Sequence, residues 1–186
     1  MKSIPNILSV LRIIIAPFLL FLAWHGQKKL FILFLVLSLL SDAVDGFIAR
    51  KFELSTKAGA RLDSIGDMAT YLTIPLCAWW LWPELLKKEV IFVLTAVSAY
   101  IFPLVAGFLK FKKLPSYHTY GAKIAAIVMS IAILLLFTTE FTLFFKFAAI
   151  FQAIVALEEM LITVLLPELK SNVKSIWHVK NKLLET

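Results

Sequence analysis

Residues 41–67 read SDAVDGFIARKFELSTKAGARLDSIGD, and they contain four aspartates at helical spacing. Asp42 and Asp45 are three residues apart, and Asp63 and Asp67 are four apart. Either spacing puts both carboxylates of a pair on one face of a helix. Long apolar runs flank the stretch on both sides. Because acidic residues are unfavourable inside membrane-like sequence, these four predict a functional site.

The short connection between the two acidic helices predicts that all four carboxylates lie at one depth. If the first helix ends near Arg50 and the second begins near Gly59, the connecting residues 51–58 reach at most about 27 Å. A hydrocarbon core is about 30 Å thick, so we expect the two helices to be antiparallel neighbours. At about 1.5 Å per residue, the acids then lie roughly 6 to 12 Å below the same membrane face.

Four clustered carboxylates need cations if all of them are to stay ionised. His and Cys are absent from the stretch, so its ligand atoms are hard oxygens. Such atoms favour Mg²⁺, with Mn²⁺ or Ca²⁺ as alternatives, over Zn²⁺. Two divalent ions would balance four negative charges, and paired metals commonly clamp the attacking and leaving oxygens in displacement at phosphorus. The stretch therefore predicts phosphoryl chemistry.

Basic and small residues surround the acids. Basic side chains are suited to holding phosphate oxygens, and small residues leave room for a ligand against the backbone. The basic residues are Arg50, Lys51, Lys57 and Arg61, and the small ones are Gly46, Ala49 and Gly59.

The spacing D-x2-D-G-x2-A-R-x8-G-x3-D-x3-D is met at every position, and it resembles the signature of the CDP-alcohol phosphatidyltransferases. The resemblance implies six transmembrane helices, a divalent-metal site, and transfer of a phosphatidyl group from CDP-diacylglycerol to an alcohol with release of CMP. It also implies a homodimer, metal binding by all four Asp residues, and Asp67 as the general base. The residues assigned to binding CDP-diacylglycerol are Gly46, Ala49, Arg50, Thr56, Lys57 and Gly59.

The segment PNILSVLR, residues 5–12, resembles the N-terminal segment of the glycerophosphate and cardiolipin branches of that family. Asn6, Ser9 and Arg12 recur every three residues and share a helix face. Arg12 is interpreted either as an arginine that extends to the membrane interface or as a phosphate clamp, and its place on the side of the acids favours the clamp. The residues expected to bind an anionic acceptor are Asn6, Arg12, Arg61 and Lys123.

The composition is that of a polytopic membrane protein. The chain has 186 residues, of which 61% are hydrophobic, and this predicts a single all-α transmembrane domain over residues 1–186. The single cysteine excludes a disulfide framework. Six apolar segments predict six spans, followed by an amphipathic tail on the membrane surface. The expected helices are 6–24, 29–49, 59–82, 89–109, 120–138 and 144–166, and the tail is 167–186.

The distribution of charge predicts the orientation in the membrane. The six-span scheme puts fourteen of the nineteen Lys and Arg residues on the side that carries the acids. The positive-inside rule makes that side and both termini cytoplasmic. We therefore expect a multi-pass protein of the inner cell membrane whose site faces the cytoplasm, where CDP-linked substrates arise. The net charge of +7 is attributed to contact with anionic lipid headgroups and not to nucleic acid.

Several acceptor alcohols are consistent with the sequence. The segment 5–12 and the available cations favour glycerol 3-phosphate, which would give phosphatidylglycerol phosphate. Met68 stands where bacterial glycerophosphate-using members often carry Lys, and DSIGD at 63–67 is closer to members that use serine or inositol phosphate. Phosphatidylglycerol is a further alternative.

A divalent-cation transporter is the alternative from another functional class, because intramembrane acids also line ion paths. A transporter predicts acids spread through the membrane, often with repeat symmetry, whereas here they cluster near one face beside basic residues. A prenyl-transferring enzyme generally needs more helices and different Asp spacings. A non-catalytic scaffold leaves the eight-position spacing unexplained.

We expect structural or interfacial roles for several other charged residues. Glu158 and Glu159 interrupt the last span, and at least one is expected to point into the helix bundle. His118 is interpreted as an interfacial loop residue, and the nearby Lys110, Lys112 and Lys113 as a basic edge attracted to lipid headgroups.

Overall fold

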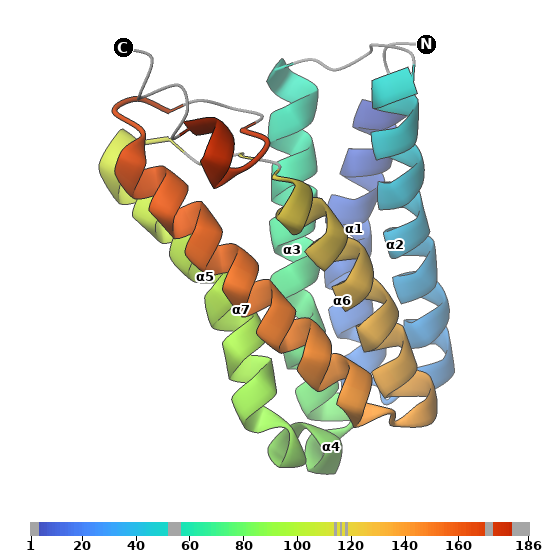
Figure 1. Ribbon diagram of the computed structural model, residues 1–186. Coiled ribbons are helices and arrows are strands. Elements are labelled where there is room, and N and C mark those ends of the chain that lie inside the picture. Colours follow the sequence, from blue (N-terminus) through green and yellow to red (C-terminus); the bar gives the residue numbers. More distant parts are fainter. Residues whose placement is uncertain are drawn as a thin grey trace. The chain divides into compact units, whose positions relative to one another are not determined.

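The computed structural model describes residues 4–51, 57–113, 115, 117, 119–169 and 173–179, without the side chains of residues 4–6, 43, 45–51, 57, 58, 60 and 61. All secondary-structure elements in the described part of the chain are helices, which confirms the all-α prediction (Figure 1). The described residues fall into two compact units, Met1–Lys88 and Glu89–Thr186. The helices are α1 (Ile4–Trp24), α2 (Lys28–Lys51), α3 (Lys57–Leu81), α4 (Pro83–Lys88), α5 (Val90–Phe111), α6 (Tyr120–Thr139) and α7 (Thr142–Leu165).

The six long helices begin and end within a few residues of the six predicted segments. The addition is α4, a six-residue helix in what was expected to be a turn. Pro83 at its start has a fixed φ suited to a first helical position. Glu84 in its first turn and Lys87 in its last turn each complement the helix dipole, and their side chains form an ion pair of 2.9 Å.

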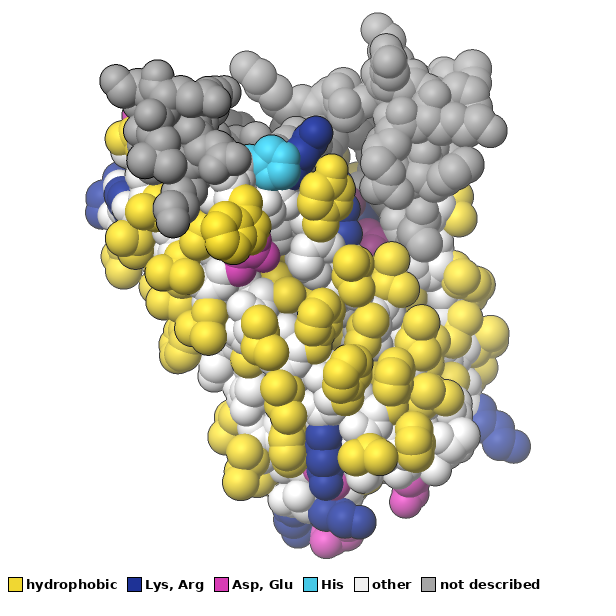
Figure 2. Space-filling view, viewed as in Figure 1, with side chains coloured by type: hydrophobic (Ala, Val, Ile, Leu, Met, Phe, Trp, Pro, Cys, Tyr) yellow, Lys and Arg dark blue, Asp and Glu magenta, His cyan; other side chains and the backbone are white. Residues whose placement is uncertain are grey.

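Four of the described helices are long and apolar enough to cross a membrane: α1, α5, α6 and α7. The helices α2 and α3 carry the acidic stretch, and their membrane crossing stays a prediction, as does the orientation of the chain. Hydrophobic side chains cover the middle of the helices, and charged ones gather toward the helix ends (Figure 2). This distribution is that of a membrane protein.

In the first unit, α1 packs along both α2 and α3 (Figure 1). Its buried face recurs every three to four residues, as on an amphipathic helix, and it contributes Ser9, Arg12, Ala16, Leu19 and Ala23. The two acidic helices were expected to be direct neighbours. In the described residues each of them instead packs mainly against α1, which therefore takes part in any site that they form.

In the second unit, α7 packs against both α5 and α6. An ion pair joins the beginnings of α5 and α7, where Nζ of the half-buried Lys146 lies 3.2 Å from Oε1 of the buried Glu89. Farther along, Gln152 Nε2 donates to the carbonyl oxygen of Ala96 at 3.3 Å. Two polar contacts inside an otherwise apolar interface fix the register of the two helices.

The end of α7 contacts the end of α5, the loop before α6 and the described part of the tail. Lys110 Nζ donates to the carbonyl oxygens of Thr163 and Val164 at 3.0 and 2.9 Å, and so satisfies acceptors that a helix end leaves unpaired. The Tyr117 hydroxyl lies 2.7 Å from Thr163 Oγ1. A small apolar cluster surrounds this bond: Tyr117, Ile162, Leu166 and Val179.

The described part of the tail packs on the second unit. Ile176 N donates to Glu158 Oε1 at 3.1 Å, and Tyr120 N donates to the carbonyl oxygen of Lys174 at 3.1 Å. Glu158 was considered for a side chain that points into the helix bundle, and the structure shows it bonded to the backbone of the tail. Part of the amphipathic pattern of the tail covers the protein itself, while Trp177 is 68% exposed. The rest of the tail and His118 lie outside the described residues.

Candidate functional site

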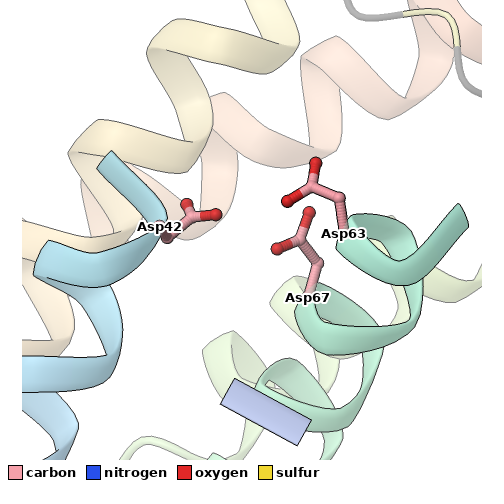
Figure 3. Close-up of side chains that lie close together, drawn as sticks. All are labelled: Asp42, Asp63 and Asp67. Atoms are coloured by element: carbon pink, nitrogen blue, oxygen red, sulfur yellow. The ribbon is translucent and has the colours of Figure 1, made fainter. Parts of the chain in front are cut away.

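Three of the four predicted metal ligands converge. Asp42 lies on α2, and Asp63 and Asp67 lie one turn apart on one face of α3. Their carboxylates point toward one another across the space between the two helices (Figure 3). One oxygen from each lies within 4.8 Å of the others. The predicted convergence of the acidic pairs is confirmed for these three residues.

The guanidinium of Arg12 on α1 joins the three carboxylates. Arg12 Nη1 donates to Oδ1 of Asp42 and, at 2.5 Å, to Oδ1 of Asp67, while Nη2 donates to Oδ1 of Asp63 at 2.5 Å. The Arg12 side chain is only 2% exposed. A buried arginine is tolerated when it is paired with charged acceptors. The sequence placed Arg12 on the side of the acids but did not identify these partners.

Gly66 allows α3 to approach α1 beside the cluster, and the sequence analysis did not single it out. A Cβ atom at this position would lie 3.4 Å from the carbonyl oxygen of Ser9 and 3.6 Å from Cβ of Arg12. These are ordinary van der Waals contacts, so a methyl group fits at this position, and we expect a larger side chain to push against α1. The position of Gly66 between Asp63 and Asp67 was the feature of the sequence that could have identified it.

We expect Gly66→Val to reduce activity at least tenfold, and Gly66→Ala to leave activity nearly unchanged. The valine side chain would push α3 away from α1 and separate the carboxylates from Arg12, at a cost of about 1–3 kcal/mol in packing. The alanine side chain fits, and it favours a helix by about 1 kcal/mol over glycine. Product formation and thermal unfolding of the purified variants measure both effects. Equal activity of the two variants would contradict the close approach of the helices.

The donor set fits a hard divalent cation. The donors are carboxylate oxygens, which lie within 4.8 Å of one another. Two oxygens on opposite sides of a bound Mg²⁺ are about 4.2 Å apart, so the two distances are similar. The side chains of Asp42, Asp63 and Asp67 are 47%, 36% and 40% exposed, so an ion and a substrate can reach them. Among the described side chains, the three carboxylates and Arg12 together carry a net charge of about −2, which matches the charge of one divalent ion.

The other predicted site residues that the structure describes lie on helices of the first unit, with one exception. The backbones of residues 45–50 and of residues 57 and 61 are helical, in α2 and α3, and their side chains are not described. Gly59, in the first turn of α3, is half-buried. Asn6 lies at the beginning of α1, and its side chain is not described either. Thr56 lies outside the described residues.

Lys123 is the exception, because it lies in the second unit. It is exposed on the first turn of α6, just after Thr119 Oγ1 accepts from Ala122 N at 3.0 Å and caps the helix.

Comparisons with known proteins identify relatives of the chain. The family model described as CDP-alcohol phosphatidyltransferase matches residues 2–167. Over 124 residues the chain is 32% identical to a cardiolipin synthase (CMP-forming)/mitochondrial hydrolase fusion protein of Schizosaccharomyces pombe, covering 63% of this chain and 19% of that protein.

Two further relatives are bacterial CDP-diacylglycerol–glycerol-3-phosphate 3-phosphatidyltransferases. The chain is 39% identical over 70 residues to the protein of Rickettsia typhi, covering 36% of this chain and 39% of that protein. It is 44% identical over 71 residues to the protein of Cereibacter sphaeroides, covering 36% of this chain and 32% of that protein. The chain thus matches less than half the length of each of these three relatives. No solved structure is significantly similar.

Proposed function

The chain belongs to the CDP-alcohol phosphatidyltransferase family, and we propose that it transfers a phosphatidyl group from CDP-diacylglycerol to glycerol 3-phosphate, releasing CMP and forming phosphatidylglycerol phosphate. The convergence of Asp42, Asp63 and Asp67 on a partly exposed face carries this proposal. Family membership makes the chain an enzyme of phospholipid synthesis, and the acceptor is the finer part of the proposal.

The proposed reaction is a displacement at phosphorus. The acceptor hydroxyl oxygen forms a bond to the phosphorus that carries the diacylglycerol moiety, and the bond from that phosphorus to the CMP oxygen breaks. Asp67 takes the proton of the acceptor hydroxyl on one carboxylate oxygen. Divalent ions held by Asp42, Asp45, Asp63 and Asp67 would supply charge neutralisation on the pyrophosphate and on the departing CMP.

The remaining proposed roles concern substrate binding. Small residues and cations near the acids hold CDP-diacylglycerol, and Asn6, Arg61 and Lys123 orient the anionic acceptor. Arg12 was also expected to bind the acceptor, but its contacts with three carboxylates support a different role. The residues proposed to hold CDP-diacylglycerol are Gly46, Ala49, Arg50, Thr56, Lys57 and Gly59.

We also propose the membrane arrangement that the sequence predicts. The 1–186 region forms one catalytic domain with six spans, both termini and the site face the cytoplasm, and two copies form a homodimer. Four helices of sufficient length and apolarity support the multi-pass part of this arrangement. The excess of Lys and Arg on the acidic side supports the orientation.

Two acceptors have specific support. Glycerol 3-phosphate is named for the relatives from Rickettsia typhi and Cereibacter sphaeroides, which match about a third of this chain. Cardiolipin synthase is named for the relative that matches 63% of it, which supports phosphatidylglycerol as the second candidate acceptor. Both candidates require the same displacement at phosphorus.

An acceptor panel tests the proposal. Purified protein with Mg²⁺ and CDP-diacylglycerol is given glycerol 3-phosphate, phosphatidylglycerol, serine or inositol phosphate, and released CMP and the lipid product are measured. We expect the highest kcat/KM with glycerol 3-phosphate, by at least tenfold. Faster formation of cardiolipin from phosphatidylglycerol would make the second candidate correct. Absence of CMP release with every acceptor, together with Mg²⁺ flux into liposomes, would favour a transporter.

A further inference from the structure

We propose that Arg12 is a positioning residue for the metal site: its guanidinium holds one oxygen of each of three aspartates from the buried side and orients the carboxylates toward divalent ions. This inference rests on the proposed metal-dependent function and adds to it a residue of α1 that acts through the acids.

The arrangement of helices creates the need for such a residue. Asp42 comes from α2, whereas Asp63 and Asp67 come from α3, and in the described residues these two helices pack mainly against α1 and not against each other. The carboxylates therefore have to be placed relative to one another through α1. Arg12 projects from α1 and contacts all three, so it links the two acidic helices at the site itself.

Electrostatic repulsion between the three carboxylates also requires a cationic residue such as Arg12. Three carboxylates with oxygens within 4.8 Å of one another repel and would turn apart without a cation. One guanidinium compensates a single charge and leaves two, so it holds the acids together and still leaves the site attractive to a divalent ion. Its burial strengthens these bonds, because they are shielded from water.

Arg12 is much more deeply buried than the three aspartates that it contacts. The Arg12 side chain is 2% exposed, whereas those of the three aspartates are between 36% and 47% exposed. Each aspartate accepts the bond from Arg12 through Oδ1. The guanidinium thus contacts one oxygen of each carboxylate from its buried side, while the exposed part of each aspartate remains accessible to an ion. Hydrogen bonds that orient metal ligands from behind typically change metal affinity 10- to 100-fold.

The planar shape of the Arg12 guanidinium also supports the inference. Arg12 uses Nη1 for two acids and Nη2 for the third, which requires the planar fork of a guanidinium. An ammonium group is a point charge on a flexible stem. A lysine at this position would keep the charge but lose the simultaneous contact with both helices.

Metal binding by the full-length protein in detergent, measured with Mn²⁺ alone and without substrate, tests the inference. We expect R12Q to weaken Mn²⁺ binding at least tenfold, and R12K to weaken it about threefold because charge is kept without the fork. Leu19→Ala is the matched control, since Leu19 is fully buried on the same helix face. This control is expected to lower the melting temperature without changing Mn²⁺ affinity.

The outcomes separate the inference from the proposed function. If the wild type binds Mn²⁺ and R12Q binds it equally well or more tightly, the guanidinium competes with the ion and the inference is wrong. If R12Q does not fold, R12K decides, because wild-type affinity in R12K excludes the role of the fork. If the wild type itself binds no Mn²⁺ or Mg²⁺, the metal-dependent function fails, and the inference fails with it.

Discussion

Asp67→Asn is expected to lower kcat by about 10³-fold while the helices remain folded, because general-base catalysis typically contributes 10²- to 10⁴-fold. The amide keeps the shape of the side chain but cannot accept the proton of the acceptor hydroxyl. It can still accept a hydrogen bond from Arg12, which donates to Asp67 Oδ1 at 2.5 Å. CMP release under single-turnover conditions measures the effect.

Glu84→Gln is the matched control for this substitution. Glu84 is a carboxylate of the same unit, its side chain is 85% exposed, and it forms an ion pair with the neighbouring Lys87 on α4. An exposed pair of this kind contributes little to stability, so we expect wild-type turnover. Turnover of Asp67→Asn above a tenth of the wild-type rate would contradict the base assignment, and helical circular dichroism shows whether each variant is folded.

The convergence of the acids could be predicted from the sequence because it depends on short-range geometry. Residues four apart, such as Asp63 and Asp67, must share a helix face, and the connection of eight residues, 51–58, is too short to cross a membrane. Asp42 then has to lie on the same side of the membrane as the second pair. This prediction did not require the position of α1.

The place of α1 could not be predicted in the same way. Periodicity shows that Ser9 and Arg12 share a face, but it does not say which helices that face contacts. Arg12 therefore had two interpretations, and its position between three carboxylates agrees with neither in detail. Gly66 was missed for the same reason, since its contact with Ser9 and Arg12 is made by a residue distant in sequence.

The amphipathic pattern of the tail did not show whether lipid or protein covers its apolar face. The tail 167–186 was expected to lie on the membrane surface, and a period of three to four residues places its Ile176 and Val179 on one side. In the structure, Val179 is buried in the cluster around Ile162 and Leu166, and Ile176 packs against it. The pattern identifies an apolar face, and tertiary contacts decide whether protein or lipid covers it.

Removal of divalent ions is expected to abolish turnover, with a loss of at least 10³-fold that Mg²⁺ or Mn²⁺ restores. Without ions, the three carboxylates keep two negative charges beside Arg12 and would repel the pyrophosphate of CDP-diacylglycerol. Zn²⁺ is expected to restore much less activity, because the cluster offers oxygen ligands and no imidazole or thiolate. Activity after chelation, dialysis and titration of each ion measures the effect.

Thermal stability provides a second measurement that does not depend on turnover. An ion that binds only the folded protein stabilises it by about 2.7 kcal/mol at a concentration of one hundred times its Kd, so Mg²⁺ should raise the melting temperature of the wild type. Asp63→Asn removes one ligand charge and should abolish most of that increase, whereas Glu84→Gln should keep it. An equal increase in both variants would mean that the ion binds elsewhere, and full activity in the chelated protein would exclude a metal-dependent displacement at this cluster.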